Sequence, residues 1–491
     1  MSESQEIRHA DGRVELRAPE DLTASPLYNH DLAPVAVKQR TWTTWDYAAL
    51  WISMAHCIPT YTLASGMIGQ GMAWWQALVT ILVGNLIVLA PILLNSHPGT
   101  KYGIPFPVYA RAAYGTIGAN LPALMRALIA CGWFGINAWI GGKALQVFIV
   151  SLWPGWYDLL GVSQYPFKNF GNTQWIAFAL FWLLNIVIIF RGMELIRRVE
   201  RFAAPFVLVM TALLLGWMLY KAGGLGPILE RSSFEPSEKH PTLMAVMIPA
   251  LTGTIAFWST LSLNMPDFTR YGRSQREQAV GQTVALPSTM TVFAAMGIMI
   301  TSATAIVYGA PISDPIDLTA EFDNRIIVAV ATFTIVIATL AVNIAANVVS
   351  PANDFANAFP KKINFQRGGL ITGLIGVAMV PWELLRDPDR YIGKWLGGYG
   401  AALGAVGGVL IIDYWIIRKT ELDLRSLYVT DGRYRYTNGW NMPAVIATLV
   451  GAGVALLGAF WEPMKPIYDW SWFVGFGLAG GIYYALMRGR R

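Results

Sequence analysis

Two apolar segments of the sequence carry polar side chains at a spacing that suits a flat, hydrogen-bonding ligand. Trp133 and Asn137 are four residues apart, so a helix would place them on one face. There an indole can stack on a planar heterocycle while the amide bonds to its edge. Asn343 and Asn347 repeat the same spacing. The alternative is that these groups only pack against neighbouring helices.

Titratable groups are rare in the apolar segments. His56 lies just before Cys57 and Pro59. Its imidazole titrates near neutral pH and can carry a proton, and Pro59 interrupts the helical hydrogen bonds beside it. Lys143 stands in another apolar run, although its long side chain could instead reach an aqueous end.

A third segment of interest covers residues 251–267. Gly253 lies there between two threonines, and Phe257 and Trp258 follow one turn later. We expect an irregular helix at Gly253. Asp267 and Arg270 would form an ion pair at an inner gate, unless they belong to an ordinary surface cluster of charges.

The composition indicates which elements must position these side chains. Of 491 residues, 55% are hydrophobic and only 13% are charged, whereas soluble domains carry about a quarter charged residues. These values exclude ordinary soluble domains and a disordered chain. Cys57 and Cys131 both lie in apolar stretches, so we expect neither a disulfide framework nor a CxxC metal site.

Twelve charge-poor runs suit helices that cross a bilayer. We place them at 47–68, 72–95, 127–152, 172–190, 202–220, 243–265, 283–308, 327–349, 368–383, 395–417, 443–461 and 470–487. The first 44 residues are polar and expected to be flexible except where they dock on the bundle, and no cleavable signal peptide opens the chain. The predicted fold class is an all-α membrane protein with twelve transmembrane helices.

The positive charges orient these spans. Twelve helices put both termini on one side, and if that side is the cytoplasm, inner segments hold 26 Lys and Arg residues against nine outside. This bias agrees with the positive-inside rule, and it explains the net charge of +6 without nucleic acid. We expect a multi-pass protein of the bacterial inner membrane, with residues 1–44 and the C-terminus in the cytoplasm.

The first and sixth spans are both irregular, which is typical of transporters built from two inverted repeats. The predicted organisation is a first repeat at 45–222, a second at 240–420, and two further helices at 436–488. The sequence contains no P-loop, no HExxH motif and no Cys/His ligand set. We therefore expect neither an ATP-driven pump nor an enzyme.

Several motifs in order resemble the nucleobase–cation symporter-1 family, over about residues 36–488. They lie at 38–42 (KQRTW), 56–61 (HCIPTY), 99–106 (GTKYGIPF), 133–137 (WFGIN), 266–270 (PDFTR), 343–351 (NIAANVVSP) and 413–418 (DYWIIR). The resemblance implies a LeuT-like fold, with a five-plus-five inverted repeat and two extra helices. It also implies secondary uptake of a planar ring that carries amide or imide groups.

The resemblance assigns roles to particular residues. It implies that Trp133 and Trp258 sandwich the ring beside Phe257, and that Asn137 and Asn347 bond to its edge. Two of the matched positions depart from the family pattern. Asn137 stands where Gln is common, and Cys57 stands where Gln or Asn occurs, so one polar contact is shortened and another is lost.

The implied sodium site also departs from the pattern. Its backbone carbonyls would belong to Ser53, His56 and Ala338. The two positions expected to supply hydroxyl groups are Ala341 and Val342. Because a hard cation prefers oxygen ligands, we favour proton coupling, with Ser53, His56, Ala338 and Lys143 as the coupling residues. Sodium stays open because the hydroxyl groups of Thr339 and Ser53 could partly substitute.

The sequence thus predicts secondary active uptake of a ring such as uracil, allantoin or hydantoin by proton symport. One alternative is a sodium-coupled symporter of the same ligands, and another is a membrane sensor that binds the ring without transporting it. We expect no cofactor beyond the coupling ion, and no nucleic-acid partner. We expect the protein to work as a monomer in the lipid bilayer.

Overall fold

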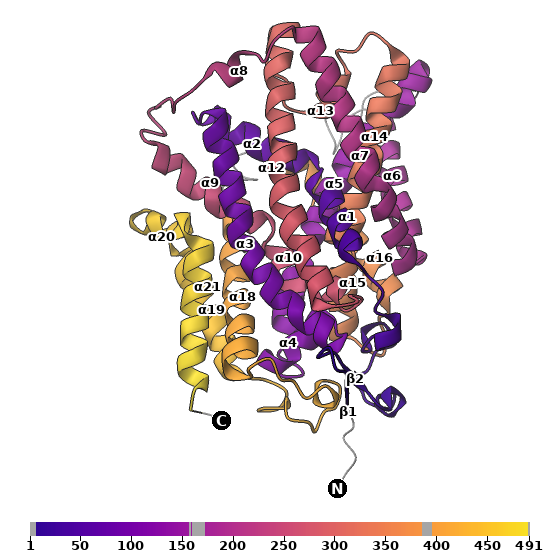
Figure 1. Ribbon diagram of the computed structural model, residues 1–491, viewed down its shortest axis with the longest axis vertical. Helices are drawn as coiled ribbons and strands as arrows, with labels where there is room; N and C mark the ends of the chain where they lie inside the picture. The colour runs from indigo at the N-terminus through magenta and orange to yellow at the C-terminus, as the bar shows by residue number, and fades with distance from the viewer. Residues whose placement is uncertain (1–5, 157–158, 160–171, 385–394, 490–491) are drawn as a thin grey trace.

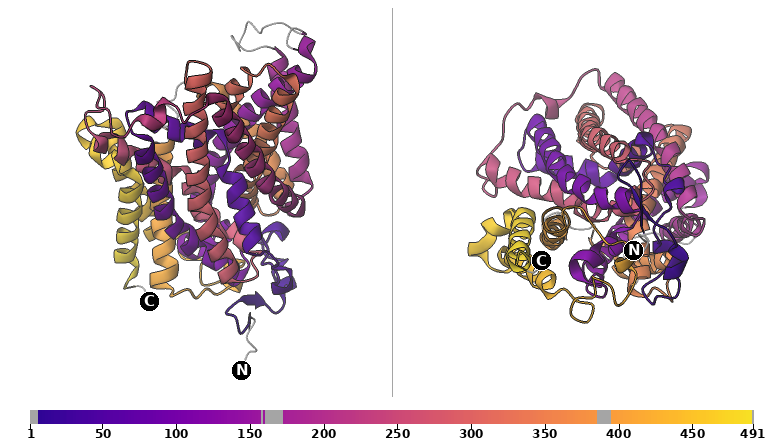
Figure 2. Two further views of the ribbon diagram at one scale, coloured as in Figure 1. Left: turned by 45° about the horizontal axis from the view of Figure 1, so that its top comes forward. Right: turned by 60° about the horizontal axis from the view of Figure 1, so that its bottom comes forward.

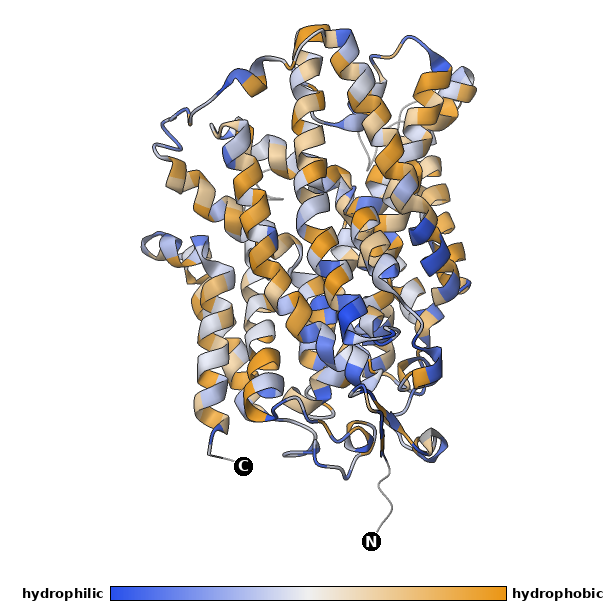
Figure 3. Ribbon diagram, viewed as in Figure 1, coloured by the Kyte–Doolittle hydropathy of each residue, from blue (hydrophilic) through white to orange (hydrophobic). Residues whose placement is uncertain are grey.

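The computed structural model of the protein describes residues 6–156, 159, 172–384 and 395–489. Long helices form a bundle, and both ends of the chain lie at the same end of it (Figures 1 and 2). Two short antiparallel strands, β1 (Glu6–Arg8) and β2 (Val14–Leu16), lie at this end. Hydrophobic residues line the long helices, as a lipid environment requires (Figure 3).

The helices follow one another without further strands in the described residues. The first half contains α1 (Thr44–Ala55), α2 (Ile58–Gly69), α3 (Trp74–Tyr102), α4 (Phe106–Tyr114), α5 (Asn120–Leu152), α6 (Asn172–Phe190), α7 (Met193–Ala222) and α8 (Pro227–Glu230). The second half contains α9 (Leu243–Phe257), α10 (Ser259–Asn264), α11 (Pro266–Thr269), α12 (Gln275–Val307), α13 (Pro315–Thr319), α14 (Arg325–Asn347), α15 (Val349–Ala358), α16 (Phe365–Ala378), α17 (Pro381–Leu384) and α18 (Gly397–Ile411). The chain ends with α19 (Met442–Phe460), α20 (Lys465–Asp469) and α21 (Ser471–Met487).

Each predicted span overlaps one helix or a broken pair of helices. Within the described ranges, eight helices are long and apolar enough to cross a membrane, and α9 and α21 are shorter apolar helices. The count of twelve spans stays a prediction. Some of the charges used to orient them lie outside the described residues, namely Lys168, Arg386, Arg390, Lys394, Arg490 and Arg491.

The fifth span begins earlier than predicted. It was placed from residue 202, but α7 starts at Met193. Arg197 and Arg201 both bind Asp46 in the first turn of α1, with nitrogen–oxygen distances of 2.8 Å and 2.7 Å. Because these charges are paired, the helix extends through a segment that looks like a polar loop in the sequence.

The N-terminal segment is anchored more firmly than predicted. Arg40 is buried, and its guanidinium group donates to the carbonyl oxygens of Val14 and Thr100 at 2.8 Å and 3.0 Å. The amide of Asn29 donates to the carbonyl oxygen of Pro360 at 2.8 Å. Carbonyl groups of the segment and of α3 thus share one buried cation, which ties the segment to the end of the bundle.

The first span is interrupted at His56 and Cys57. The helix ends at Ala55 and resumes at Ile58, with Cys57 in an extended conformation. Pro59 lies in the first turn of α2, where its missing N–H group is not needed. The freed carbonyl oxygen of Ala55 accepts a hydrogen bond from the Thr60 hydroxyl at 2.8 Å.

The sixth span is interrupted at Trp258, and the irregularity predicted at Gly253 is wrong. Gly253 lies inside α9, which continues to Phe257 before α10 begins at Ser259. The Ser259 hydroxyl donates to the carbonyl oxygen of Ile255 at 3.1 Å. A serine hydroxyl that bonds to a preceding carbonyl often bends a helix, whereas Gly253 is accommodated within the continuous helix α9.

Helices α18 and α21 pack closely through glycines. A Cβ atom added at Gly408 would collide with the carbonyl oxygen of Phe476, and one added at Gly404 would lie 2.7 Å from the carbonyl oxygen of Trp472. Small residues let two helix backbones approach each other inside a membrane. Gly404 and Gly408 therefore serve packing, whereas a Cβ atom added at Gly398 would meet nothing within 4 Å.

The substitution Gly408→Ala is expected to lower the free energy of unfolding by about 1–3 kcal/mol, because the methyl group overpacks this contact. The control Gly453→Ala on α19, where an added Cβ meets nothing within 4 Å, is expected to raise it by up to about 1 kcal/mol, since alanine favours the helix. Thermal unfolding in detergent measures both changes. Changes of the same sign would contradict the close packing.

Candidate functional site

A small cavity lies where the two interrupted helices meet α5 and α14. All six residues predicted to contact the ligand line it: Trp133, Asn137, Phe257, Trp258, Asn347 and Cys57. Met54, Pro59, Thr260, Leu261, Val342 and Ala346 complete its walls. The breaks in the two helices thus bring distant segments of the chain to one point.

The aromatic side chains of the cavity pack edge to face. The Phe257 ring lies 5.3 Å from Trp133 and 4.9 Å from Trp258, measured between ring centroids. Trp51 supports Trp258 from behind at 5.2 Å. Phe257 thus contacts both indoles of the cavity.

Two buried polar atoms of the cavity residues have no hydrogen-bond partner. They are the Oδ1 atom of Asn137 and the Nε1 atom of Trp258. An unpaired buried donor or acceptor destabilises a protein by about 1–3 kcal/mol. One of these atoms accepts and the other donates, so together they match a ring that carries both N–H and carbonyl groups.

The amide of Asn347 is oriented by a chain of asparagines. Its Nδ2 atom donates to Oδ1 of Asn343 at 3.0 Å, and Asn343 donates to Oδ1 of Asn185 on α6 at 3.2 Å. Asn343 therefore supports Asn347 from behind. Trp133 is held in a similar way, because its indole N–H donates to the Tyr399 hydroxyl at 3.2 Å.

The cavity between these residues is almost filled by their own side chains. Its free volume is ≈ 20 Å³, which is enough for about one water molecule and too small for a heterocycle. The structure therefore represents a closed arrangement of the site.

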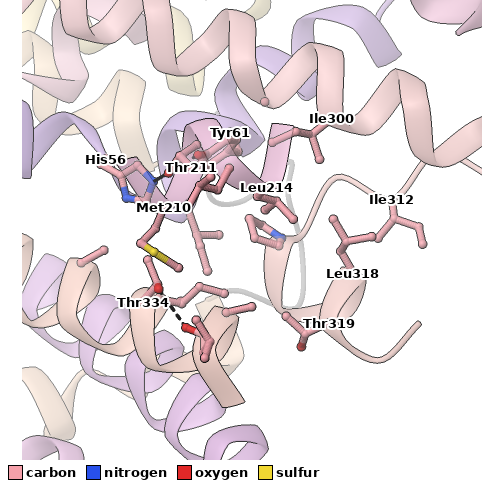
Figure 4. A pocket seen from close by; sticks show the side chains of 18 of the residues that line it. His56, Tyr61, Met210, Thr211, Leu214, Ile300, Ile312, Leu318, Thr319 and Thr334 are labelled. Atoms are coloured by element: carbon pink, nitrogen blue, oxygen red, sulfur yellow. Dashed lines mark hydrogen bonds between the residues drawn. The ribbon is translucent and has the colours of Figure 1, made fainter. Parts of the chain in front are cut away.

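A larger cavity lies next to this site (Figure 4), and α13, which borders it, lies in the half of the bundle opposite to the termini (Figure 1). Its volume is ≈ 290 Å³, and Cys57 lines both cavities. His56 and Tyr61 border it near the break in the first span, and Ile312 and Leu318 border it farther out. We refer to it as the outer cavity.

Three of the predicted coupling residues lie near this break. His56 and Ala338 line the outer cavity. The Nε2 atom of His56 lies 2.5 Å from the Thr211 hydroxyl oxygen on α7. The Ser53 hydroxyl is buried and hydrogen-bonded to the carboxyl group of Glu200, also on α7.

Lys143 lies apart from the other predicted coupling residues. Its Nζ atom is 3.1 Å from Oδ2 of Asp314 and 2.6 Å from Oδ1 of Asp317 on α13. Its side chain is 36% exposed, and it lines neither cavity. This arrangement agrees with the alternative interpretation, in which the long side chain reaches an end of the bundle.

The two predicted gate residues are buried but bind separate partners. Asp267 accepts hydrogen bonds from the Phe106 backbone N–H group at 3.0 Å and from the Ser350 hydroxyl. Arg270 donates to the carbonyl oxygen of Asp31 at 2.8 Å. The predicted ion pair between Asp267 and Arg270 does not occur among the ion pairs of the described residues, because each side chain is engaged elsewhere.

A different ion pair lies on this side of the site. Arg126 of α5 and Asp354 of α15 are fully buried, and their closest nitrogen–oxygen distance is 3.8 Å. Arg126 also donates to the carbonyl oxygen of Ala346, a residue of the cavity wall, at 3.2 Å. Both carboxylate oxygens of Asp354 lack a hydrogen-bond partner. If this side of the bundle opened, water would solvate these oxygens.

Glu200, Arg126 and Asp354 are not among the residues that the sequence singles out. Arg126 directly precedes the predicted span at 127–152, and Glu200 lies two residues before the span at 202–220, because these spans exclude charged residues. A helical extension of each span by one turn would have included them. No signal in the sequence distinguishes these buried charges from the exposed ones beside them.

Comparison with known proteins identifies the family. Residues 34–475 match the family described as permeases for cytosine/purines, uracil, thiamine and allantoin. The chain is 42% identical to an allantoin permease of Bacillus subtilis, over 94% of this chain and 93% of that protein. It is 40% identical to a purine–uracil permease of Arabidopsis thaliana, over 94% of this chain and 78% of that protein.

The fold is similar to that of Mhp1, a nucleobase–cation symport-1 family transporter solved in a closed conformation with bromovinylhydantoin bound. The TM-score is 0.78 at 23% identity, over 94% of this chain and 96% of that chain. For the inward-facing conformation of Mhp1 it is 0.74, at 23% identity over 95% of each chain. The predictions of an all-α, LeuT-like fold and of a transporter rather than an enzyme are confirmed. The chain belongs to the nucleobase–cation symporter-1 family of permeases for cytosine/purines, uracil, thiamine and allantoin.

Proposed function

We propose that the protein takes up a nucleobase or a related planar amide heterocycle, of the uracil, allantoin or hydantoin type, by proton symport. The ring stacks between Trp133 and Trp258 once Phe257 moves aside, and Asn137 and Asn347 bond to its edge. The observation that carries this proposal is the pair of unpaired atoms, Asn137 Oδ1 and Trp258 Nε1, among the aromatic rings of one cavity.

Selectivity in this proposal rests on hydrogen bonds. Aromatic stacking accepts many flat rings, whereas a buried polar group rejects a ring that leaves it unpaired. Cys57 offers only a weak hydrogen bond to a ligand. The amides of Asn137 and Asn347 and the indole N–H of Trp258 therefore carry most of the discrimination between rings.

The residues near the break in the first span support proton coupling. Ala341 and Val342 carry no side-chain oxygen, and the Ser53 hydroxyl is engaged by Glu200. Sodium coupling is the second candidate, because the hydroxyl-bearing Thr339 lines the outer cavity beside Ala338. A sodium ion at this place would have to be coordinated mostly by backbone carbonyl oxygens.

We further propose that a monomer works in the bacterial inner membrane with both termini in the cytoplasm. The common location of both chain ends and the excess of positive charge on that side support this orientation. The outer cavity would then open toward the exterior. A hollow path on one side of the site and a buried ion pair on the other favour a transporter that alternates over a sensor.

Cells that express the protein are expected to accumulate radiolabelled allantoin, uracil or hydantoin equally well with and without sodium. A protonophore is expected to abolish accumulation, because it removes the proton gradient. Cells with an empty vector serve as the control. Accumulation that requires sodium would contradict proton coupling, and failure to take up any of the three rings would contradict the proposed ligand class.

The substitution Trp258→Phe is expected to weaken ligand affinity by about tenfold, because it keeps an aromatic face but removes one hydrogen bond. Trp472→Phe is the matched control, since Trp472 is a buried tryptophan of α21 whose Nε1 atom also lacks a partner. The ligand affinity of the Trp472→Phe variant is expected to equal that of the wild type. The apparent KM of uptake measures both, and equal values for the two variants would contradict a role for the Trp258 N–H group.

A further inference from the structure

We propose that the carboxyl group of Glu200 is the proton-binding site that couples transport to the proton gradient, with Ser53 as its hydrogen-bond partner at the break in the first span. This inference rests on the proposed proton symport and names the group that carries the proton.

Glu200 is isolated within the protein. It is 3% exposed, and its Oε1 atom is buried without a hydrogen-bond partner. No ion pair of Glu200 occurs in the described part of the chain, and its hydrogen bond there is to Ser53. Burial of a carboxylate without a cation is costly, whereas a protonated carboxylic acid is neutral and can donate a hydrogen bond.

The geometry at Ser53 is compatible with the protonated form of Glu200. The hydroxyl oxygen of Ser53 contacts both Oε2 of Glu200 and the carbonyl oxygen of Leu50, the latter at 3.2 Å. A hydroxyl group has a single hydrogen to donate. When Ser53 donates this hydrogen to Leu50, its oxygen can accept the acid proton of Glu200, so the site can hold the protonated acid.

The surrounding charges do not neutralise Glu200. Arg197 and Arg201, which lie on α7 with Glu200, are both paired with Asp46 of α1. Helix α6 contains no ionisable side chain. The charged or titratable groups on the other elements packed against α7 are Asp46 and Tyr47 on α1, His56 at its end, Arg276 and Glu277 on α12, and Arg325 on α14. Glu277 is bonded to Thr44 and Arg273, and Arg325 begins α14 at the outer end.

The position of Glu200 links a proton to the ligand site. Ser53 lies in the last turn of α1, just before the break at His56 and Cys57, and Cys57 lines the ligand cavity. Helix α7 packs against both α1 and α14. A change in the charge of Glu200 therefore acts on the two helices that hold the coupling residues and one wall of the site.

In the proposed cycle, Glu200 binds one proton while the outer side is open and releases it on the inner side. With the outer side open, the Glu200 carboxylate takes up one proton and becomes the neutral acid that fits the closed protein. When the pairs of Asp46 with Arg197 and Arg201 separate on the inner side, water reaches the acid. The proton then leaves to the cytoplasm, because water solvates the carboxylate.

Glu200→Gln tests the inference in proteoliposomes loaded for allantoin transport, since glutamine keeps the shape and neutrality of the acid. A pH gradient of about one unit drives about tenfold accumulation at one proton per ring. The variant is expected to lose this accumulation and its proton influx while it still exchanges labelled for unlabelled allantoin within about twofold of the wild type. The control Glu194→Gln alters an exposed glutamate of the same helix and is expected to retain accumulation.

The outcomes separate the two proposals. If the wild type exchanges allantoin but does not respond to a pH gradient, the proposed proton symport fails, and this inference with it. If the wild type responds and Glu200→Gln still accumulates allantoin with the gradient, only the assignment to Glu200 is overturned. Loss of exchange together with accumulation in a folded variant would also overturn it, because Glu200 would then serve ligand binding or structure.

A second measurement covers the case in which Glu200→Gln does not fold. Dicyclohexylcarbodiimide reacts with protonated carboxyl groups in apolar surroundings. In the wild type at neutral pH, mass spectrometry is expected to find Glu200 modified at least about tenfold more than the exposed Glu194. Equal or weaker modification of Glu200 would overturn the proposal.

Discussion

Everything at the site depends on one constraint: backbone groups freed inside a membrane protein must find partners within the protein, because lipid offers none. Short hydroxyl side chains of the broken helices meet this need. Thr60 bonds to the carbonyl oxygen of Ala55, and Ser259 bonds to that of Ile255. Since these local bonds satisfy the breaks, the longer side chains of the same segments are available to line a cavity.

The same constraint explains why the two sides of the site differ. Toward the termini, the space is filled by charged and polar groups that bind one another or backbone carbonyls, such as Arg126, Arg270 and Arg40. Toward the opposite end, the walls are mostly apolar and enclose a cavity of ≈ 290 Å³. An apolar cavity can stay open without unpaired groups, whereas the polar side needs its ion pairs to remain closed.

Charge was a good guide to the fold and a poor guide to the site. Charge-poor runs locate the helices because each must bury a long apolar surface in lipid. The same rule excluded Glu200 from the fifth span, although α7 carries it into the interior. The rule also placed Lys143 inside the membrane. In the structure, Lys143 is paired with Asp314 and Asp317, which follow the predicted span at 283–308. A single charge thus does not reveal its environment, because its partner lies elsewhere in the chain.

The sequence by itself determined the helical class, the positions of the apolar segments and the six residues that gather around one small cavity, since hydrophobic length and family motifs are local properties. Only the tertiary structure decided that the second break falls at Trp258, that Asn137 Oδ1 and Trp258 Nε1 lack partners, and that Glu200 faces Ser53. These features depend on which groups from distant helices meet. A hydrogen bond, or its absence, is a property of the packed bundle and cannot be assigned to one segment alone.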